Sequence, residues 1–284
     1  MAFIHHHDDN FSVKLRLEEI SRRLWVTGYS TGHPAALCSY LKELAQQHNM
    51  EKIIFPVKAS DFELFAGDGF IREGRIPGYF NGEDSYFLAA FTSQGRSVSL
   101  TLENEKKMLN DITGKSTAWE KQFPHGITIR RAVKSDTTPM AGLFSSVFDS
   151  YPTPVFDPEY LACSLDRGDI FMVAVRDSRI VAVAAAEIDR EHRRAELSDC
   201  ATDPGSRGIG LNTLLLSGLE KECLSRNISC LFSLARASSY GMNLVLHRLG
   251  YIYGGTLVNN CHIGGGFENM NVWVRSGSNQ KAVS

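Results

Sequence analysis

The chain has 284 residues, of which 43% are hydrophobic, and its formal net charge at pH 7 is -2. This length can bury a full core and is typical of two domains. The near-neutral charge argues against a nucleic-acid groove, because such grooves cluster Lys and Arg. No apolar run approaches the roughly 18 residues of a membrane span, and the N-terminus has no signal-peptide pattern. We therefore expect a cytoplasmic protein that binds neither nucleic acid nor a membrane.

The cysteine and histidine patterns favour neither a disulfide framework nor a metal centre. The six cysteines are scattered, at positions 38, 163, 200, 223, 230 and 261, with no C-x-x-C pair. Reduced thiols are the expected state in the cytosol. The histidines at 5–7 could ligate a metal, but adjacent histidines on a polar terminus are typically solvated. We expect no metal site.

Hydrophobic periodicity in the first part of the chain predicts a strand, an amphipathic helix, a second strand and a short helix. These elements span 23–28, 34–47, 52–57 and 60–66.

The second part of the chain predicts a longer series of elements. A strand at 127–131 and a helix at 136–148 precede strands at 170–175 and 180–188. After a strand that carries Glu196, a turn and a helix, the series ends with a strand at 228–234, a helix at 242–249 and a hairpin over 250–275. Ser238 is the N-cap candidate of the last helix.

The two parts of the chain share the order strand, helix, strand, helix. Aligning 59–60 with 237–238 and 69–70 with 250–251 needs a gap of only three residues, which favours a degenerate internal repeat. The turn at 29–34 has a single glycine and no arginine, so it lacks the groups that hold a pyrophosphate. The alternative is that strand and helix recur at this interval in any α/β chain.

A glycine-rich turn connects the strand of the second part to its helix. The first N–H groups of a helix are unpaired and lie at the positive end of its dipole, so such a turn can bind phosphate. A Walker A loop is excluded because Leu211 and Asn212 follow Gly210 where Lys and Ser or Thr are required. A dinucleotide fingerprint is excluded because Thr213 follows Gly208 and Gly210 where a third glycine is required.

The pattern that fits is Arg-x-x-Gly-x-small, which Arg207, Gly210 and Asn212 satisfy. It resembles the acetyl-CoA pyrophosphate loop of the GCN5-related N-acetyltransferase (GNAT) superfamily, although Asn212 departs from the usual Gly or Ala. With the flanking elements, the resemblance covers roughly residues 126 to 275. It implies the α/β (α+β) GNAT fold, a mixed central sheet with helices on both faces.

The resemblance also implies a domain organisation and a cofactor. We expect a degenerate, half-GNAT-like domain at 1–120, a catalytic GNAT domain at 126–276 and a disordered tail at 277–284. Acetyl-CoA is the implied co-substrate, without a metal. The residues implied in binding it are Cys200, Ala201, Thr202, Arg207, Gly208, Ile209, Gly210, Leu211, Ser238 and Asn243.

Acetyl transfer to an amine requires a proton acceptor. A lysine-type amine has a pKa near 10.4, so holding it neutral at pH 7 costs on the order of 4 to 5 kcal/mol. The segment 195–202 resembles the strand that carries the catalytic glutamate in the histone-acetylating branch, which makes Glu196 the first candidate for general base. The alternative for Glu196 is a pair with Arg193 or Arg194. Asp199 is the second candidate, although alternation places it on the opposite face unless a bulge intervenes.

Two further groups complete the predicted chemistry. The superfamily usually provides backbone N–H groups near 200–202 as oxyanion donors. Many relatives place a general-acid Tyr where this chain has Leu246, and Tyr240, Tyr251 and His247 are the nearby substitutes. Each of these three is also a reasonable packing or surface residue, and a thiolate with a pKa of about 8.5 can leave without a strong acid.

The segments 251–273 and 78–86 resemble the β-lysine N-acetyltransferases, which make the compatible solute Nε-acetyl-β-lysine. The resemblance implies a small zwitterionic acceptor with a second amine. Side chains of the hairpin that could bind it are Asn259, Asn260, Glu268 and Asn271, and the alternative is a polar hairpin rich in turn residues.

The sequence leaves other functions open. An acetyltransferase for another small amine or for lysine would share every catalytic feature, and a non-catalytic acyl-CoA-binding module would share the loop. A homodimer formed through the hairpin strands is also compatible with the pattern.

Overall fold

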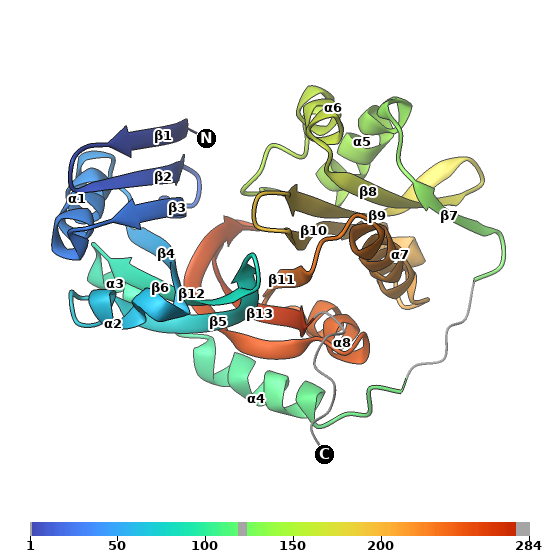
Figure 1. Cartoon of the computed structure of the whole chain (residues 1–284). Coiled ribbons are helices and arrows are strands. Elements are labelled where there is room, and N and C mark those ends of the chain that lie inside the picture. The colour runs from blue at the N-terminus through green and yellow to red at the C-terminus, as the bar shows by residue number, and fades with distance from the viewer. Residues whose placement is uncertain (1, 119–123, 277–284) are drawn as a thin grey trace, which may run out of the picture.

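The computed structural model describes residues 2–118 and 124–276, and the predicted disordered tail at 277–284 lies outside them. The strands of these residues form a single 13-stranded mixed sheet that runs through both parts of the chain (Figure 1). Its order is β1-β2-β3-β4-β6-β5-β12-β13-β11-β10-β9-β8-β7.

We call residues 2–118 the N-terminal half. Its strands are β1 (Ala2–His7), β2 (Phe11–Glu18), β3 (Arg23–Thr31), β4 (Lys52–Lys58), β5 (Ile71–Phe80) and β6 (Glu83–Phe91). Its helices are α1 (Pro34–Gln47), α2 (Phe62–Phe65), α3 (Gln94–Ser97) and α4 (Leu102–Thr113), with the 3-10 turn η1 (Ala59–Asp61) before α2.

We call residues 124–276 the C-terminal half. Its strands are β7 (Ile127–Arg131), β8 (Ile170–Arg176), β9 (Arg179–Asp189), β10 (Arg194–Thr202), β11 (Cys230–Arg236), β12 (Ile252–Ile263) and β13 (Gly266–Ser276). Its helices are α5 (Thr137–Val147), α6 (Pro158–Arg167), α7 (Leu211–Ser225) and α8 (Tyr240–Arg248), with the 3-10 turns η2 (Lys134–Asp136) and η3 (Pro204–Ser206).

The two halves contribute the same strand topology to the sheet. Read inward, the N-terminal half runs β1-β2-β3-β4-β6-β5 and the C-terminal half runs β8-β9-β10-β11-β13-β12, with β7 added outside β8. In each series the third and fourth strands are parallel, and the other neighbours are antiparallel. The series meet where Gly74 of β5 pairs antiparallel with Gly255 of β12. This order supports the hypothesis of an internal repeat.

Irregular positions of the two central strands correspond as well. The register shifts fall at 72–74 and 76–80 in β5, and at 253–255 and 257–261 in β12. Inside the second shift, Gly78 has a φ of 72° and Asn259 has a φ of 43°. Bulges are specific local features, so their matching spacing also supports the repeat.

Helices pack against the sheet in both halves. Leu37 of α1 lies in the buried cluster of the N-terminal half, and Leu215 of α7 lies in the equivalent cluster of the C-terminal half. α5 and α6 cover the other face of β8 and β9, so helices lie on both faces of the C-terminal sheet, as predicted. Near the junction, the face opposite α1 and α7 holds a third apolar cluster that includes Trp25 and Phe232.

The connector helix α4 belongs to the N-terminal half in sequence but packs on the C-terminal half. Its Leu109 and Ile112 share a buried cluster with Leu246 of α8. In addition, the hydroxyl of Tyr240 donates to Asp111 over 3.2 Å. The two halves are therefore joined by this helix as well as by the sheet.

The structure confirms most predicted elements and corrects some boundaries. α1 has the predicted bounds of 34–47, and β11 begins two residues later than predicted. The N-cap of α8 is Ser239 rather than Ser238, and the Ser238 hydroxyl donates to Glu268. The structure also contains elements where periodicity predicts none, namely β1, β2, β5, β6, α3, α4 and α6.

Candidate functional site

The strand β10 carries a bulge next to both predicted catalytic carboxylates. Its register against β9 shifts between Ser198 and Ala201, and Asp199 has a φ of 47°. An extra residue in one strand reverses the alternation of side chains beyond it. Asp199 is therefore turned toward the face of Glu196, where the charge of Glu187 of β9 acts on both carboxylates.

The strands β10 and β11 diverge beyond a short parallel ladder. Their pairing covers only Arg194 to Glu196 of β10, and the last link is the Ser233 hydroxyl, which donates to the carbonyl of Leu197 over 2.7 Å. A pocket of about 1280 Å³ lies where the strands separate, between the turn before α7 and the start of α8. This volume exceeds the roughly 300–1,000 Å³ of typical small-molecule pockets, so the pocket is large enough for an extended ligand.

The glycine-rich turn forms one end of this pocket. Gly208 and Gly210 both have a φ of 80°, a conformation that favours glycine, and Gly210 is the N-cap residue of α7. The Arg207 Nε donates to the carbonyl of Thr202 over 3.3 Å. The Thr202 hydroxyl donates to Asn212 Oδ1 over 3.0 Å, which gives the unusual asparagine a partner and ties the turn to the end of β10.

Charge is unevenly distributed along the pocket. Arg207, Arg236 and Arg248 line the part near the turn and α8. Asp199 is the single acidic residue among the described residues that line it. The pocket thus has basic side chains beside the open N-terminus of α7 and one carboxylate at its β10 wall, and the basic end suits a ligand with phosphate groups.

The buried carboxylates of this face have raised pKa values. Burial, followed by the charge of Glu187, raises the pKa of Glu196 well above its ordinary value. The same two causes raise the pKa of Asp199, against the effect of the Tyr151 hydroxyl. Burial also raises the pKa of Glu187, and Arg16 of β2 opposes it. The pKa values of Glu196 and Asp199 are each raised to about 8, so these two carboxylates can exchange protons near neutral pH.

The alternative partners of Glu196 are engaged elsewhere. Arg194 forms an ion pair with Asp189 at 2.8 Å. Arg193 donates to the side chain of Asn227 over 2.7 Å. Within the described residues, neither arginine forms an ion pair with Glu196, so the structure does not support the alternative reading of this carboxylate as a strand-edge ion pair.

The predicted cofactor residues divide into two groups. The positions Cys200, Thr202, Arg207, Gly208, Ile209, Gly210 and Leu211 line the pocket. Ala201 packs under the strand in the cluster of α5 and α6, and Ser238 donates to Glu268 over 2.7 Å. The amide of Asn243 is fully used inside the protein, because it donates to the carbonyl of Arg236 and accepts from Trp273.

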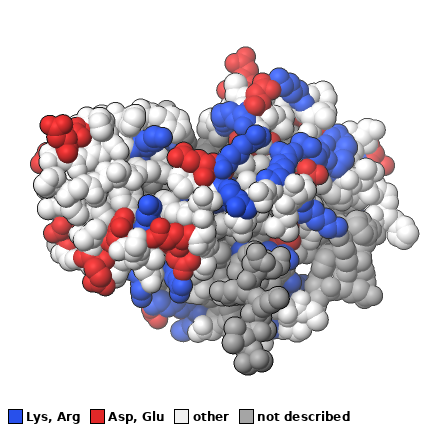
Figure 2. All heavy atoms as spheres, viewed as in Figure 1, with Lys and Arg blue, Asp and Glu red and all other residues white. Residues whose placement is uncertain are grey.

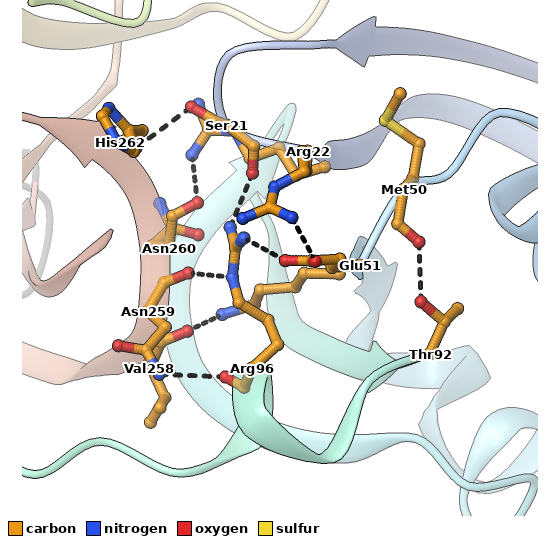
Figure 3. Close-up of polar contacts among 12 residues, drawn as sticks. Ser21, Arg22, Met50, Glu51, Thr92, Arg96, Val258, Asn259, Asn260 and His262 are labelled. Atoms are coloured by element: carbon orange, nitrogen blue, oxygen red, sulfur yellow. Dashed lines mark hydrogen bonds and ion pairs between the residues drawn. The ribbon is translucent and has the colours of Figure 1, made fainter. Parts of the chain in front are cut away.

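The predicted acceptor residues of the hairpin lie outside this pocket. At the junction of the halves, the amide of Asn259 donates to the carbonyl of Arg96 (Figure 3). It also donates to the carbonyl of Val98. The Asn271 amide donates to Asn243 Oδ1 over 2.9 Å. These two side chains therefore hold β12 and β13 against their neighbours.

The other two predicted acceptor residues differ in their surroundings. Glu268 accepts from Ser238 and lies 3.7 Å from Arg236. The Asn260 side chain is 1% exposed, and neither of its polar atoms has a partner within the described residues.

The predicted substitutes for a general acid do not line the pocket. Tyr240 bonds Asp111, the ring of His247 bonds the carbonyl of Lys115, and Tyr251 is buried. A different tyrosine, Tyr151 in the α5–α6 loop, lines the pocket beside Asp199. No sequence motif marks Tyr151, because only the folded loop brings it to β10.

Comparisons with known proteins agree with this geometry. Residues 137–251 match the family model described as the acetyltransferase (GNAT) family. The chain is 37% identical over 231 residues to N-acetyltransferase YodP of Bacillus subtilis, which covers 81% of this chain and 84% of the relative. It is 34% identical over 259 residues to Beta-lysine N(6)-acetyltransferase of Methanosarcina mazei, which covers 83% of this chain and 94% of the relative. The chain belongs to the GNAT acetyltransferase family.

Membership in the GNAT family confirms the predicted fold and the predicted enzyme class. The chain is also 26% identical over 263 residues to Beta-lysine N(6)-acetyltransferase of Methanococcus maripaludis, and the match covers 92% of this chain and 95% of the relative. GNAT acetyltransferases take their acetyl group from acetyl-CoA. Among residues 2–118 and 124–276, no helix is both long and apolar enough to cross a membrane, and no group of three His, Cys, Asp or Glu side chains could hold a metal ion.

Proposed function

We propose that this GNAT enzyme transfers an acetyl group from acetyl-CoA to the terminal amine of β-lysine, in a ternary complex. The observation that carries the proposal is one continuous pocket that joins the glycine-rich turn to Asp199. The two relatives named Beta-lysine N(6)-acetyltransferase align over most of this chain, which supports the choice of acceptor.

The residues of the pocket suit coenzyme A. The open N-terminus of α7 and the backbone of Gly208 and Gly210 can hold a diphosphate, with Arg207 beside them. When bound, acetyl-CoA supplies an activated acetyl thioester. The bulge leaves the peptide groups of Asp199 and Cys200 outside the β9 ladder, so they are available as donors for an oxyanion.

The buried carboxylates of β10 supply the proton acceptor. Asp199 lies on the pocket wall, and Glu196 lies on the same face of the strand next to Glu187. An acceptor ammonium must lose its proton before it can attack, and a carboxylate with a raised pKa can receive that proton directly or through water. We place this role on the two carboxylates Glu196 and Asp199.

We propose that the N-terminal half is a degenerate copy that does not bind the cofactor. Its turn enters α1 through His33 and Pro34, and Pro34 has no N–H to offer a phosphate. The edge of β12 is already paired with β5, so a homodimer would use a surface other than this hairpin edge. We also propose a metal-free reaction in the cytoplasm, without a nucleic-acid or membrane partner.

A screen of acceptor amines tests the proposal. Initial rates with acetyl-CoA are measured for β-lysine, α-lysine and spermidine, and the products are identified by mass spectrometry. We expect β-lysine to give a kcat/KM at least about 10-fold above the others, because an acceptor that fills the site gains more than one polar contact. A higher kcat/KM for another amine would replace β-lysine as acceptor. Cofactor binding without turnover of any amine would indicate a non-catalytic module.

A further inference from the structure

The sheet curves so strongly that strands far apart in its order face each other. Arg23 of β3 donates to the carbonyl of Asn260 in β12 over 3.2 Å, although three strands lie between them in the sheet. Arg194 of β10 donates to the carbonyl of Tyr79 in β5 over 3.3 Å, again with three strands between. Each half thus donates a hydrogen bond to the central strand of the other half. We call the concave face of the sheet between β2–β3 and β9–β10 the trough.

The two walls of the trough carry opposite charges at equivalent positions. Arg16 of β2 pairs across the ladder with Trp25 of β3, and Glu187 of β9 pairs in the same way with Glu196 of β10. Trp25 and Glu196 are both third in their parallel ladders, next to Ile54 and Phe232. The repeat therefore places a cation and an indole on one wall where the other wall has two carboxylates.

The walls are close enough to interact. The contacts of Arg23 with Asn260 and of Arg194 with Tyr79 draw the strands of the two walls together, although seven strands separate β2 from β10 in the sheet. In agreement with this, the charge of Arg16 opposes the rise in the pKa of both Glu187 and Glu196. In a flat sheet, eight spacings of about 4.8 Å would hold these strands roughly 38 Å apart. Within the described residues, Arg16 forms its ion pair with Glu18 and none with Glu187 or Glu196. The opposed charges therefore face each other without direct contact.

The Arg16 guanidinium is held in place through its Nε, and its two terminal nitrogens are not bonded by the described residues. Its Nε lies 2.7 Å from Glu18 Oε1, and its central carbon lies 5.7 Å from the ring of Trp25. Glu18 also pairs with Arg23, which fixes the carboxylate. Among the described residues, no acceptor bonds the two terminal nitrogens of Arg16, and the side chain is 23% exposed. The fork geometry of these nitrogens matches a carboxylate.

We propose that Arg16 binds the carboxylate of the amino-acid acceptor, so that the N-terminal half supplies the specificity of the site. This inference rests on the proposed function. A diamino acid has a carboxylate at one end and an ammonium at the other, which complements an arginine on one wall and carboxylates on the opposite wall. Figure 2 shows basic and acidic side chains meeting where the two halves join.

The alternative role of Arg16 is purely electrostatic. In that role it would only adjust the charge of Glu187 and Glu196 and would not touch the acceptor. The two roles can be distinguished by the acceptor. If Arg16 binds the carboxylate directly, the enzyme prefers an acceptor that has a carboxylate over the same molecule without one, whereas a purely electrostatic role gives no such preference. The acceptor pair is therefore β-lysine and its carboxamide, which keeps both amines and the chain length.

The test compares Arg16→Ala and Arg16→Lys with the control Lys14→Ala. Lys14 is an exposed cation on the same strand and the same face as Arg16. Its loss therefore removes an equal charge and leaves Arg16, the proposed carboxylate-binding residue, in place. We expect the wild type to prefer β-lysine over its amide by about 10-fold or more. Arg16→Ala should lower kcat/KM for β-lysine by about 10- to 100-fold and for the amide by less than about 3-fold.

The other variants complete the test. Arg16→Lys should recover part of the preference, because a point charge replaces a bidentate fork, and Lys14→Ala should retain all of it. An equal loss on both acceptors, no loss on either, or a wild type indifferent to the carboxylate would overturn the proposal. Thermal melts establish that each variant is folded. If Arg16→Ala is not folded, Arg16→Gln replaces it in the comparison. If the screen selects α-lysine, the same comparison is made with lysinamide, so failure of the β-lysine assignment and failure of the receptor remain distinguishable.

Discussion

The N-terminal and C-terminal halves share a scaffold but differ in chemistry. Both have one extra residue in the third strand of the series, near Thr27 of β3 and near Asp199 of β10. The turn that follows differs, since it leads through Pro34 in the first half and through Gly210 in the second. The bulge belongs to the shared architecture, whereas the cofactor turn and the carboxylates are specific to one copy. A few substitutions on a common frame therefore decide which half can act as a catalyst.

The largest expected effect concerns the carboxylates that only the C-terminal half has. We expect the double variant Glu196→Gln, Asp199→Asn to lower kcat by about 10³-fold, since general-base catalysis contributes roughly 10² to 10⁴. Glu191→Gln, an exposed carboxylate in the β9–β10 loop, serves as the control and should retain the wild-type rate. Single-turnover rates measured at saturating acetyl-CoA check this. A double variant with more than a third of the wild-type rate would remove both residues from the proton transfer.

The second effect concerns the contact that joins the halves. A Cβ on Gly255 would lie 2.2 Å from the carbonyl oxygen of Glu73, and Gly255 has a φ of 138°. Gly255→Ala should therefore lower the free energy of unfolding by about 3 kcal/mol or more. Gly142→Ala, in the helix α5 with no atom within 4 Å of its new Cβ, should be neutral or slightly stabilising. Urea titrations measure both variants, and equal stability of the two would contradict this account of the junction.

The third effect compares the two turns. Gly210→Ala places a side chain at a φ of 80°, which costs about 1–2 kcal/mol and displaces the backbone. We expect the Kd for acetyl-CoA to rise about 10-fold. Gly32→Ala, in the equivalent turn of the N-terminal half, has open space around its new Cβ, with the nearest atom at 4.0 Å, and should leave the Kd unchanged. Calorimetric titrations decide, and a weaker Kd in Gly32→Ala would mean that the first turn also binds cofactor.

The smallest effect is on pH dependence. The pKa of Glu196 is raised to about 8, so the rate should rise with pH through this region instead of near the ordinary value of 4.5. Because the native state binds this proton more tightly than the unfolded state, the group favours folding at low pH and loses that contribution as pH rises toward 8. Glu196→Gln should therefore lose less stability than the wild type between about pH 5 and pH 8. Thermal melts over this range measure the difference, and parallel losses would indicate that Glu196 titrates normally.

Local patterns in the sequence predicted the parts of the fold that depend on neighbouring residues. The helix α1 follows from its apolar spacing and from Pro34 at its first position. The turn at Gly208 and Gly210 follows from glycines placed before an apolar helix. By contrast, the bulge at Asp199 depends on the partner strand β9, and no local signal in β10 marks it.

Long-range packing explains what the sequence did not predict. From the sequence, the hairpin asparagines are expected to bind the acceptor, because a small zwitterion with a second amine needs polar partners. Here β12 lies in the middle of a 13-stranded sheet, so the half-buried Asn259 and the buried Asn271 bond neighbouring segments. Arg16 and Glu196 face each other only because the whole sheet is curved, and no single segment of the sequence predicts that curvature.

The docking of α4 on α8 has a consequence for how the polypeptide can be divided. A protease cut just after Lys115, which is exposed, would sever the chain beyond α4. The first fragment would still hold Leu109 and Ile112 in the cluster around Leu246 and would still pair β5 with β12. The nicked protein would therefore remain a non-covalent complex of its two fragments, and the same position would suit new termini in a circularly permuted chain.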